Sequence, residues 1–269
     1  MGRTVLVNSV LDSQLVYLMS SLQLPPTVIH QMDRRRRAFL WSVDKNGSCT
    51  PSACLVAWEN CCFPKDLGGL GVKDLTTQNL CLLIKLLHRV HFPKTSAWAQ
   101  WVQGRASVAN LKGDLHGDHW NTLRQILPLY QAITTVLIEN GTTCTFWHDV
   151  WFQDESLEDL CPALYSHCNV KDCTVAEMLN NGLSNSLVPR LTARATTELH
   201  FVQQLLGDVT LDSSTDKRIS VFSKGEFGLD TGAMYRLLKS RRQHNDLGAN
   251  FVWKNSAPPR VQLFMWLLV

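Results

Sequence analysis

Three glycines within four positions, Gly68, Gly69 and Gly71, are the strongest local constraint on how this chain can fold. Glycine tolerates positive φ and the close approach of another backbone segment, so such a cluster predicts a tight turn. The cluster follows an apolar run that contains Trp58 and a turn that begins at Pro64. A phosphate-binding P-loop would need a Lys-Ser/Thr pair at the start of the next helix, and the sequence has none there. We therefore expect these glycines to shape the backbone rather than to bind phosphate.

The composition describes a chain that can bury a core but has no strong overall charge. With 269 residues, of which 45% are hydrophobic, it can form one large or two small domains. Its net charge of only +3 means that any basic binding site must be local. Nine cysteines without a secretory leader predict reduced thiols in the nucleus or cytoplasm. No apolar run approaches the roughly 18 residues of a membrane helix, so we expect no membrane partner.

The hydrophobic periodicity predicts a mainly α-helical fold (α+β) with two small β-hairpins. Helical spacing of apolar residues extends over 3–21, 27–41, 75–87, 118–128, 187–206 and 233–240. One hairpin is predicted near 136–147, where Asn140-Gly141 supplies a turn, and the other over 219–229. We expect a helical module over 1–90, a mixed region over 91–205 and a third module over 206–269.

Four consecutive arginines, Arg34 to Arg37, lie in the predicted helix 27–41. On a helical wheel Arg34 and Arg37 point away from the apolar stripe, whereas Arg35 and Arg36 flank it. We expect the first pair to be solvated and the second pair to lay its aliphatic stems along the core. Because arginines neutralise phosphates irrespective of base sequence, Arg34, Arg35, Arg37 and Arg241 are the candidate contacts to a nucleic acid. The alternative is a solvated helix face without a ligand.

Other groupings of reactive side chains are interpreted as structural or incidental. The possible metal ligands are Cys161, His167, Cys168 and Cys173, and the His-x-x-His pairs at 88/91 and 116/119. Structural zinc sites usually combine two closely spaced ligand pairs, which these groups lack, so we expect thiols that are buried or incidental, surface imidazoles and no metal site. The acidic residues Asp154, Glu155, Glu158 and Asp159 indicate a solvated loop. No nucleophile motif is present, and the tryptophans are expected mainly in the core.

Four sequence blocks occur in an order that is typical of one protein family. They are GRTVLVNSVLDSQLVYLMSSLQLPPTVIHQMDRRRRAFLWS; LVAWENCCFPKDLGGLGVKDL, which contains Trp58, Pro64, Gly68, Gly69 and Gly71; a stretch of the form N-G-x-x-x-x-F-W-x-D-x-W, with Asn140, Gly141, Phe146, Trp147, Asp149 and Trp151; and KGEFGLDTGAMYRLL followed by FVWKNSAPPRVQLFMWLL. In this order they resemble plant LINE-type (non-LTR retrotransposon) reverse transcriptases, in the region after the polymerase palm. The first two blocks resemble the thumb, the third the connection, and the last the beginning of the zinc-binding domain.

The resemblance implies a polymerase family but not a polymerase site in this chain. Reverse transcription in the family uses Mg²⁺ held by palm aspartates, one of them in an Asp-Asp turn, and this chain has no Asp-Asp pair. The zinc ligands of the C-terminal domain are expected beyond Val269. We therefore expect no cofactor here, although the full-length family would use Mg²⁺ and Zn²⁺.

Three functional hypotheses follow from these observations. The first is a non-catalytic fragment of a retrotransposon reverse transcriptase (RNA-directed DNA polymerase), cut off before the end of its zinc-binding domain. The second is a residual, sequence-independent nucleic-acid-binding module that uses the Arg34–Arg37 helix on an RNA or DNA primer–template. The third is an element remnant without a selected function. The sequence carries no signal for an oligomeric state.

Overall fold

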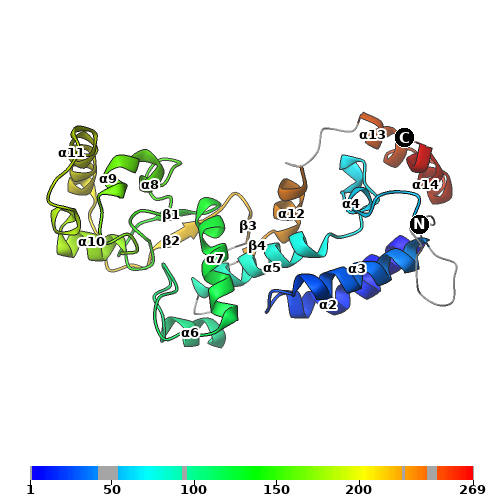
Figure 1. Cartoon of the computed structure of the whole chain (residues 1–269), viewed down its shortest axis with the longest axis horizontal. Coiled ribbons are helices and arrows are strands. Elements are labelled where there is room, and N and C mark those ends of the chain that lie inside the picture. The colour runs from blue at the N-terminus through cyan, green and yellow to red at the C-terminus, as the bar shows by residue number, and fades with distance from the viewer. Residues whose placement is uncertain (1, 42–53, 93–95, 226–227, 241–246, 269) are drawn as a thin grey trace. The chain divides into compact units, whose positions relative to one another are not determined.

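The computed structural model describes residues 2–41, 54–92, 96–225, 228–240 and 247–268 (Figure 1). The fold is mainly α-helical with two small antiparallel two-stranded sheets, which confirms the predicted fold class. The chain divides into two compact units, unit 1 comprising Met1–Leu86 with Asp230–Val269 and unit 2 comprising Leu87–Leu229. The predicted segment 206–269 is thus shared between the units, because residues 206–229 pack in unit 2.

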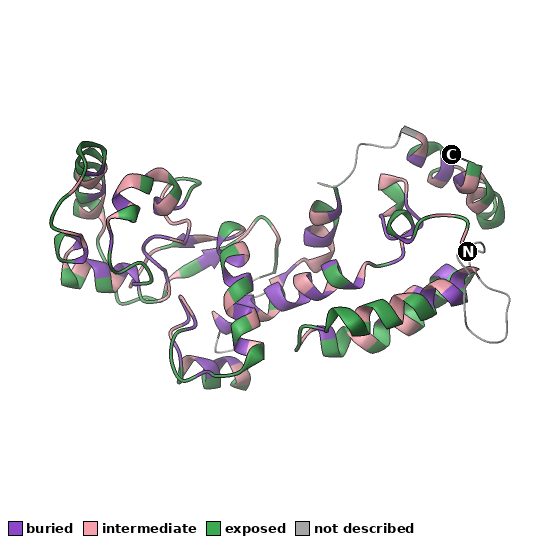
Figure 2. Ribbon diagram, in the orientation of Figure 1, coloured by how far each residue is buried: buried purple, intermediate pink, exposed green. Residues whose placement is uncertain are grey.

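All the regular elements among the described residues of unit 1 are helices. Its elements are α1 (Gly2–Leu6), the π-helical segment η1 (Val7–Leu11), α2 (Asp12–Met19), α3 (Pro26–Trp41), α4 (Trp58–Cys61), the 3₁₀ turn η3 (Lys65–Leu67), most of α5 (Leu75–Val90), α12 (Thr231–Ser240), α13 (Leu247–Trp253) and α14 (Pro259–Leu268). Figure 2 shows α5 mostly coloured as buried, whereas α2 and α3 carry long exposed stretches.

Unit 2 contains the four strands and the remaining helices. Its elements are α6 (Ala97–Gln103), α7 (Asp118–Ala132), β1 (Thr135–Leu137), α8 (Leu157–Leu160), α9 (Pro162–Ser166), α10 (Val175–Asn181), the 3₁₀ turn η5 (Leu183–Ser186), α11 (Ala193–Asp208), β2 (Lys217–Ile219), β3 (Ser223–Lys224) and β4 (Gly228–Leu229). Among the described residues, no helix has the length and the apolar composition that a membrane crossing requires.

The glycine cluster forms the predicted structural turn. Gly68 and Gly71 have φ values of 80° and 77°, in the left-handed region. Gly69 has no room for a side chain, because a Cβ there would lie 2.0 Å from the carbonyl oxygen of Phe63. The same Phe63 oxygen accepts a hydrogen bond from the amide of Gly71 at 2.9 Å. Trp266 of α14 donates its indole N–H to the Gly68 carbonyl at 2.7 Å, so the turn also anchors the last helix of unit 1.

A π-helical segment interrupts the first long helix and sets which residues face the core. In η1 the amide of Asp12 bonds the carbonyl of Val7, five residues earlier. In a regular α-helix, two residues five positions apart point about 140° away from each other. The wider π turn brings Val7 and Asp12 inward together, with 0% and 4% of their surfaces exposed. An aspartate is thereby placed in the interior of unit 1.

The partner of this buried carboxylate is Arg36 of α3, whose side chain is fully buried. Its guanidinium contacts Asp12 through Nε–Oδ1 at 2.9 Å and Nη2–Oδ2 at 3.0 Å. It also donates to Asp33 at 2.6 Å and to the carbonyl of Lys73 at 2.5 Å, and its carbon Cζ lies 5.3 Å from the centre of the Trp58 ring. This one side chain connects α2, α3, α4 and the segment before α5.

The predicted hairpin near 136–147 is wrong, although its turn residues behave as expected. Gly141 has a φ of 67°, but β1 pairs with β2, with Val136 opposite Arg218. The reason is Asp216, whose carboxylate accepts the amides of Glu139, Gly141 and Thr143 at 2.8, 2.8 and 2.9 Å. These bonds draw the loop 139–143 to the segment just before β2, so that the two strands meet.

The second predicted hairpin forms within the predicted region, but its first strand begins at Ser223 and not at Ile219. Ser223 pairs with Leu229 and Lys224 with Gly228, across a turn in which Gly225 has a φ of 66°. Ile219, expected in this hairpin, instead pairs with Thr135. The strand therefore begins later than the apolar run suggests, because Ile219 is already used by β2.

We expect Asp12→Asn to destabilise unit 1 by about 3–5 kcal/mol, because it leaves the buried Arg36 guanidinium without its countercharge. The measurement is urea unfolding followed by tryptophan fluorescence. Asp66→Asn, at an exposed position of the same unit, is the matched control and should change the free energy of unfolding by less than about 0.5 kcal/mol. The double variant Asp12→Leu/Arg36→Met should recover most of the loss. Equal effects of Asp12→Asn and Asp66→Asn would contradict the role assigned to the pair.

Candidate nucleic-acid interface

The four arginines of α3 are divided among three environments. Arg34 and Arg35 are exposed, Arg36 is buried, and Arg37 is half-buried. The predicted exposure of Arg34 is confirmed, but Arg35 and Arg37 have exchanged the places that the wheel assigned to them. Arg36, which the wheel placed beside the stripe, is fully buried, whereas the apolar Phe39 of the same helix is 41% exposed, so the inward face of α3 is turned toward Arg36.

Trp58 explains why Arg37 is drawn back toward the protein. The guanidinium carbon of Arg37 lies 5.5 Å from the centre of the Trp58 ring, a cation–π distance. Trp58 itself is 7% exposed and packs in a core cluster with Leu40, Leu70 and Trp266. Trp58 lies in the core, as expected from the sequence. The sequence did not indicate its contacts with Arg36 and Arg37.

A groove lies beside the exposed arginines. Its volume is about 470 Å³, and its lining residues are His30, Arg34, Arg37, Cys54, Leu55, Val56, Ala57, Trp58 and Glu59. The three α3 residues are spaced at i, i+4 and i+7, which places them on one face of the helix. The groove therefore has a basic wall from α3 and a second wall from the segment that leads into α4.

The charge of the chain is concentrated in unit 1. Unit 1 contains 15 Lys and Arg against 8 Asp and Glu, a net charge of +7, whereas unit 2 contains 11 against 15, a net charge of −4. Arg241, the fourth candidate contact, lies outside the described residues. Nearby, Lys239 of α12 is buried and forms an ion pair with Asp74, so it is not available at the surface.

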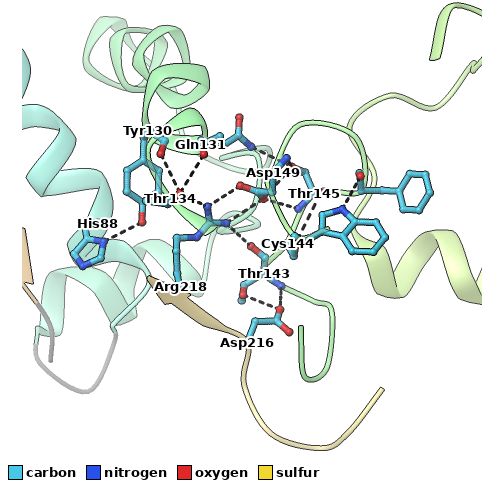
Figure 3. A network of polar contacts seen from close by, with 12 residues as sticks. His88, Tyr130, Gln131, Thr134, Thr143, Cys144, Thr145, Asp149, Asp216 and Arg218 are labelled. Carbon is cyan, nitrogen blue, oxygen red and sulfur yellow. Dashed lines mark hydrogen bonds and ion pairs between the residues drawn. The ribbon is translucent and has the colours of Figure 1, made fainter. Parts of the chain in front are cut away.

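Asp149, from the block that also contains Asn140, Gly141, Trp147 and Trp151, belongs to a buried polar network in unit 2 (Figure 3). Its centre is an ion pair that sequence reasoning missed, between Asp149 and Arg218 of β2. The two guanidinium nitrogens meet the two carboxylate oxygens at 2.6 and 3.0 Å. Burial disfavours the charged form of Arg218, but the Asp149 carboxylate outweighs this and raises the pKa of the guanidinium.

Further hydrogen bonds surround the ion pair, although Arg218 Nε has no acceptor among the described residues. Arg218 also donates to the Thr134 hydroxyl at 3.0 Å and to the Thr143 carbonyl at 3.2 Å. Asp149 accepts the amide and the hydroxyl of Thr145 at 2.7 and 2.9 Å. Trp147 is fully buried, and Trp151 donates to the Phe146 carbonyl at 2.9 Å. With both charges enclosed by protein groups, the motif holds the core of unit 2 together rather than presenting a reactive group.

Two histidines border this network, contrary to the expectation of surface imidazoles. His88 is 2% exposed, and its Nδ1 lies 3.1 Å from the hydroxyl of Tyr130. Burial, with a smaller contribution from the positive charge of Arg218, lowers the pKa of His88 to about 4. His91 stacks on the Tyr130 ring with 5.5 Å between ring centres. His88 is thus a neutral core residue at physiological pH.

The described cysteines, histidines and acidic residues outside this network do not form a metal or catalytic site. Within the described part of the chain, no three His, Cys, Asp or Glu side chains are grouped so that they could hold a metal ion. Burial raises the pKa of the Cys161 thiol to about 11 and that of Cys173 to about 12, so both are weak nucleophiles. In the acidic loop, Glu158 contacts His148 at 2.5 Å and Asp159 accepts from Ser156 at 2.6 Å.

Comparisons with known proteins give one informative relative. A curated Arabidopsis thaliana protein named "Putative ribonuclease H protein" is 27% identical over 99% of this chain. The chain spans 44% of the length of that relative. No family model matches the chain, and no solved structure matches it.

The buried state of His88 predicts a loss of stability in mild acid. In the unfolded chain this imidazole takes up a proton near its ordinary pKa of 6.5, whereas in the folded protein it does so only near 4. The contribution of His88 to the free energy of unfolding is therefore fully present above pH 6.5. It falls as the pH is lowered toward 4, by about 2 kcal/mol between pH 7 and 5.

His88→Gln removes this contribution, and thermal unfolding of both proteins at pH 7 and 5 measures it. We expect the decrease in melting temperature to be smaller in the variant. His116→Gln, at an exposed position, is the control and should keep the wild-type pH dependence. Identical pH dependence of His88→Gln and wild type would contradict the assignment.

Proposed function

We propose that this chain is a non-catalytic nucleic-acid-binding region that contacts phosphate backbones through unit 1. The observation that carries the proposal is the exposed pair Arg34 and Arg35 on α3, neither of which forms an ion pair with a described residue. Backbone contacts of this kind give affinity without sequence preference. The net charge of +7 on unit 1, against −4 on unit 2, supports the same conclusion, because the excess of cations lies in the unit that carries α3.

The anchoring of α3 suits it to this role. Arg36 fixes the helix against Asp12 and Trp58, so the exposed arginines project from a rigid support. A positioned cation loses less conformational entropy on binding than one on a mobile loop. The buried Arg36 therefore holds α3 in the position in which Arg34 and Arg35 are exposed.

We further propose that the chain corresponds to the region after the palm of a LINE-type reverse transcriptase, with an RNA or DNA primer–template as its partner. The four sequence blocks in family order support this proposal. The Arabidopsis relative is named as a ribonuclease, an enzyme class that acts on RNA, which is compatible with a partner of this kind. Arg34 and Arg35 would then hold the duplex by its phosphates.

The double variant Arg34→Ala/Arg35→Ala tests the backbone contact. We measure the dissociation constant for a blunt DNA duplex by fluorescence anisotropy over a series of salt concentrations. For the wild type, the logarithm of the affinity should fall linearly with the logarithm of the salt concentration. The slope should decrease in magnitude by about 1 for each phosphate contact that is lost. Arg190→Ala, at an exposed position of the acidic unit 2, is the matched control and should change neither affinity nor slope. A salt-independent affinity, or equal slopes for wild type and double variant, would rule the proposal out.

The non-catalytic part of the proposal has a separate test. The purified chain, incubated with a primed RNA template and Mg²⁺ or Mn²⁺, should neither extend the primer nor cleave an RNA–DNA hybrid. Binding to the same primer–template, measured in the same buffer, shows that the protein is folded and active in binding. Template-dependent extension, or hybrid cleavage, in proportion to protein concentration would overturn this part.

A further inference from the structure

The groove beside α3 differs from the exposed arginine surface because it combines cations with an apolar wall. His30, Arg34 and Arg37 form the basic wall, and Leu55 and Val56 lie on the other side. Leu55 is 67% exposed, so the apolar wall of this groove of about 470 Å³ is accessible to a ligand. Pockets of about 300–1,000 Å³ are of the size that takes a small organic group.

The polar groups of the groove are mainly hydrogen-bond donors. Arg37 Nε and Trp58 Nε1 are buried and find no acceptor among the described residues. Among the described residues, Arg34 has no carboxylate partner, and Glu59 is the one acidic side chain that lines the groove. The exposed guanidinium of Arg34 lines the groove and can donate to oxygen atoms that a ligand supplies there. The groove thus favours an anion over a cation.

We propose that this groove binds an unpaired nucleotide of a single strand, with its phosphate at Arg34 and Arg37 and its base against Leu55 and Val56. A base paired within a duplex cannot turn its face to a side chain, whereas an unpaired base can. The apolar wall therefore distinguishes single strands from duplexes, which the exposed Arg34 and Arg35 do not. This inference rests on the proposed function and makes it more specific.

A nucleotide fits the groove better than an acidic peptide does. Carboxylates would satisfy the arginines, but a stretch of acidic residues brings no flat apolar surface to meet Leu55 and Val56. A strand that leaves the groove also meets more phosphate-binding charge, because Arg35 is exposed on the same helix and unit 1 has a net charge of +7.

The test compares a fluorescein-labelled oligo(dT), an oligo(U) and a blunt DNA duplex on the whole chain at one salt concentration. Leu55→Glu places a negative charge at the apolar wall and should raise the dissociation constant for both single strands roughly tenfold, and for the duplex by a clearly smaller factor, because the duplex meets Arg34 but not the apolar wall. Leu268→Glu is the matched control, since Leu268 is 70% exposed in the same unit but does not line the groove. It makes the same change of charge and should leave all three affinities close to wild type.

A second measurement locates the bound strand. Photocrosslinking of an oligonucleotide that contains 4-thiouridine, followed by peptide mass spectrometry, should place the crosslinks within 55–59 in the wild type. Leu55→Glu should lose them and Leu268→Glu should keep them.

The outcomes separate this inference from the proposed function. Salt-dependent duplex binding without preference for the single strands, or equal effects of Leu55→Glu and Leu268→Glu, would overturn the inference alone. Binding of neither duplex nor single strand would overturn the proposed function. Displacement of the oligonucleotides by poly(aspartate) at equal charge concentration would show that the groove selects acidic chains rather than nucleotides.

Discussion

A buried guanidinium must be given a countercharge and a full set of hydrogen-bond acceptors, and unit 1 is arranged around that requirement at Arg36. Its carboxylate partner, Asp12, reaches the interior because the π-helical segment rotates the chain before it. The carbonyl of Lys73 fixes the start of α5 to the same guanidinium. These contacts of Arg36 fix the rotation of α3 about its own axis. That rotation decides which of the other arginines on the helix face solvent.

Unit 2 also gives a buried guanidinium its countercharge, with a different pair. Arg218 and Asp149 are 69 positions apart in sequence and both are buried, so their contact joins β2 to the loop after β1. Asp216, two residues before Arg218, takes up the loop amides that a local hairpin would otherwise have used. Removal of one partner from such a pair costs far more than the pair contributes in net stability. Each pair therefore acts mainly by disfavouring any fold that leaves one of its two charges buried alone, and less by adding net stability.

The features that sequence predicted are those determined by neighbours in the chain. Helix α3 begins and ends within one residue of its prediction, and the backbone at Gly68, Gly69 and Gly71 has the predicted constraints, because both depend on local spacing and sterics. The prediction of the first hairpin was wrong because the carboxylate of Asp216, far along the sequence, accepts the backbone amides of the loop 139–143. For the same reason Asp149 could be recognised as part of a motif while its partner Arg218 carried no local signal. The helical wheel placed Arg37 outward and the stem of Arg35 along the core, and the structure reverses these two assignments, because tertiary partners such as Trp58 do not appear in local spacing.

Net charge is informative for binding only at the scale over which charges act. At physiological salt the screening length is about 8 Å, so a bound polyanion responds to nearby side chains and not to the sum over the chain. The overall value of +3 conceals units of +7 and −4, and within unit 1 part of the positive charge is withdrawn into ion pairs at Arg36 and Lys239. The cations left at the surface of α3, Arg34 and Arg35, are thus few but rigidly placed. In the proposed function, the buried Arg36 would fix the position of α3, and the exposed Arg34 and Arg35 would supply the contacts to phosphate.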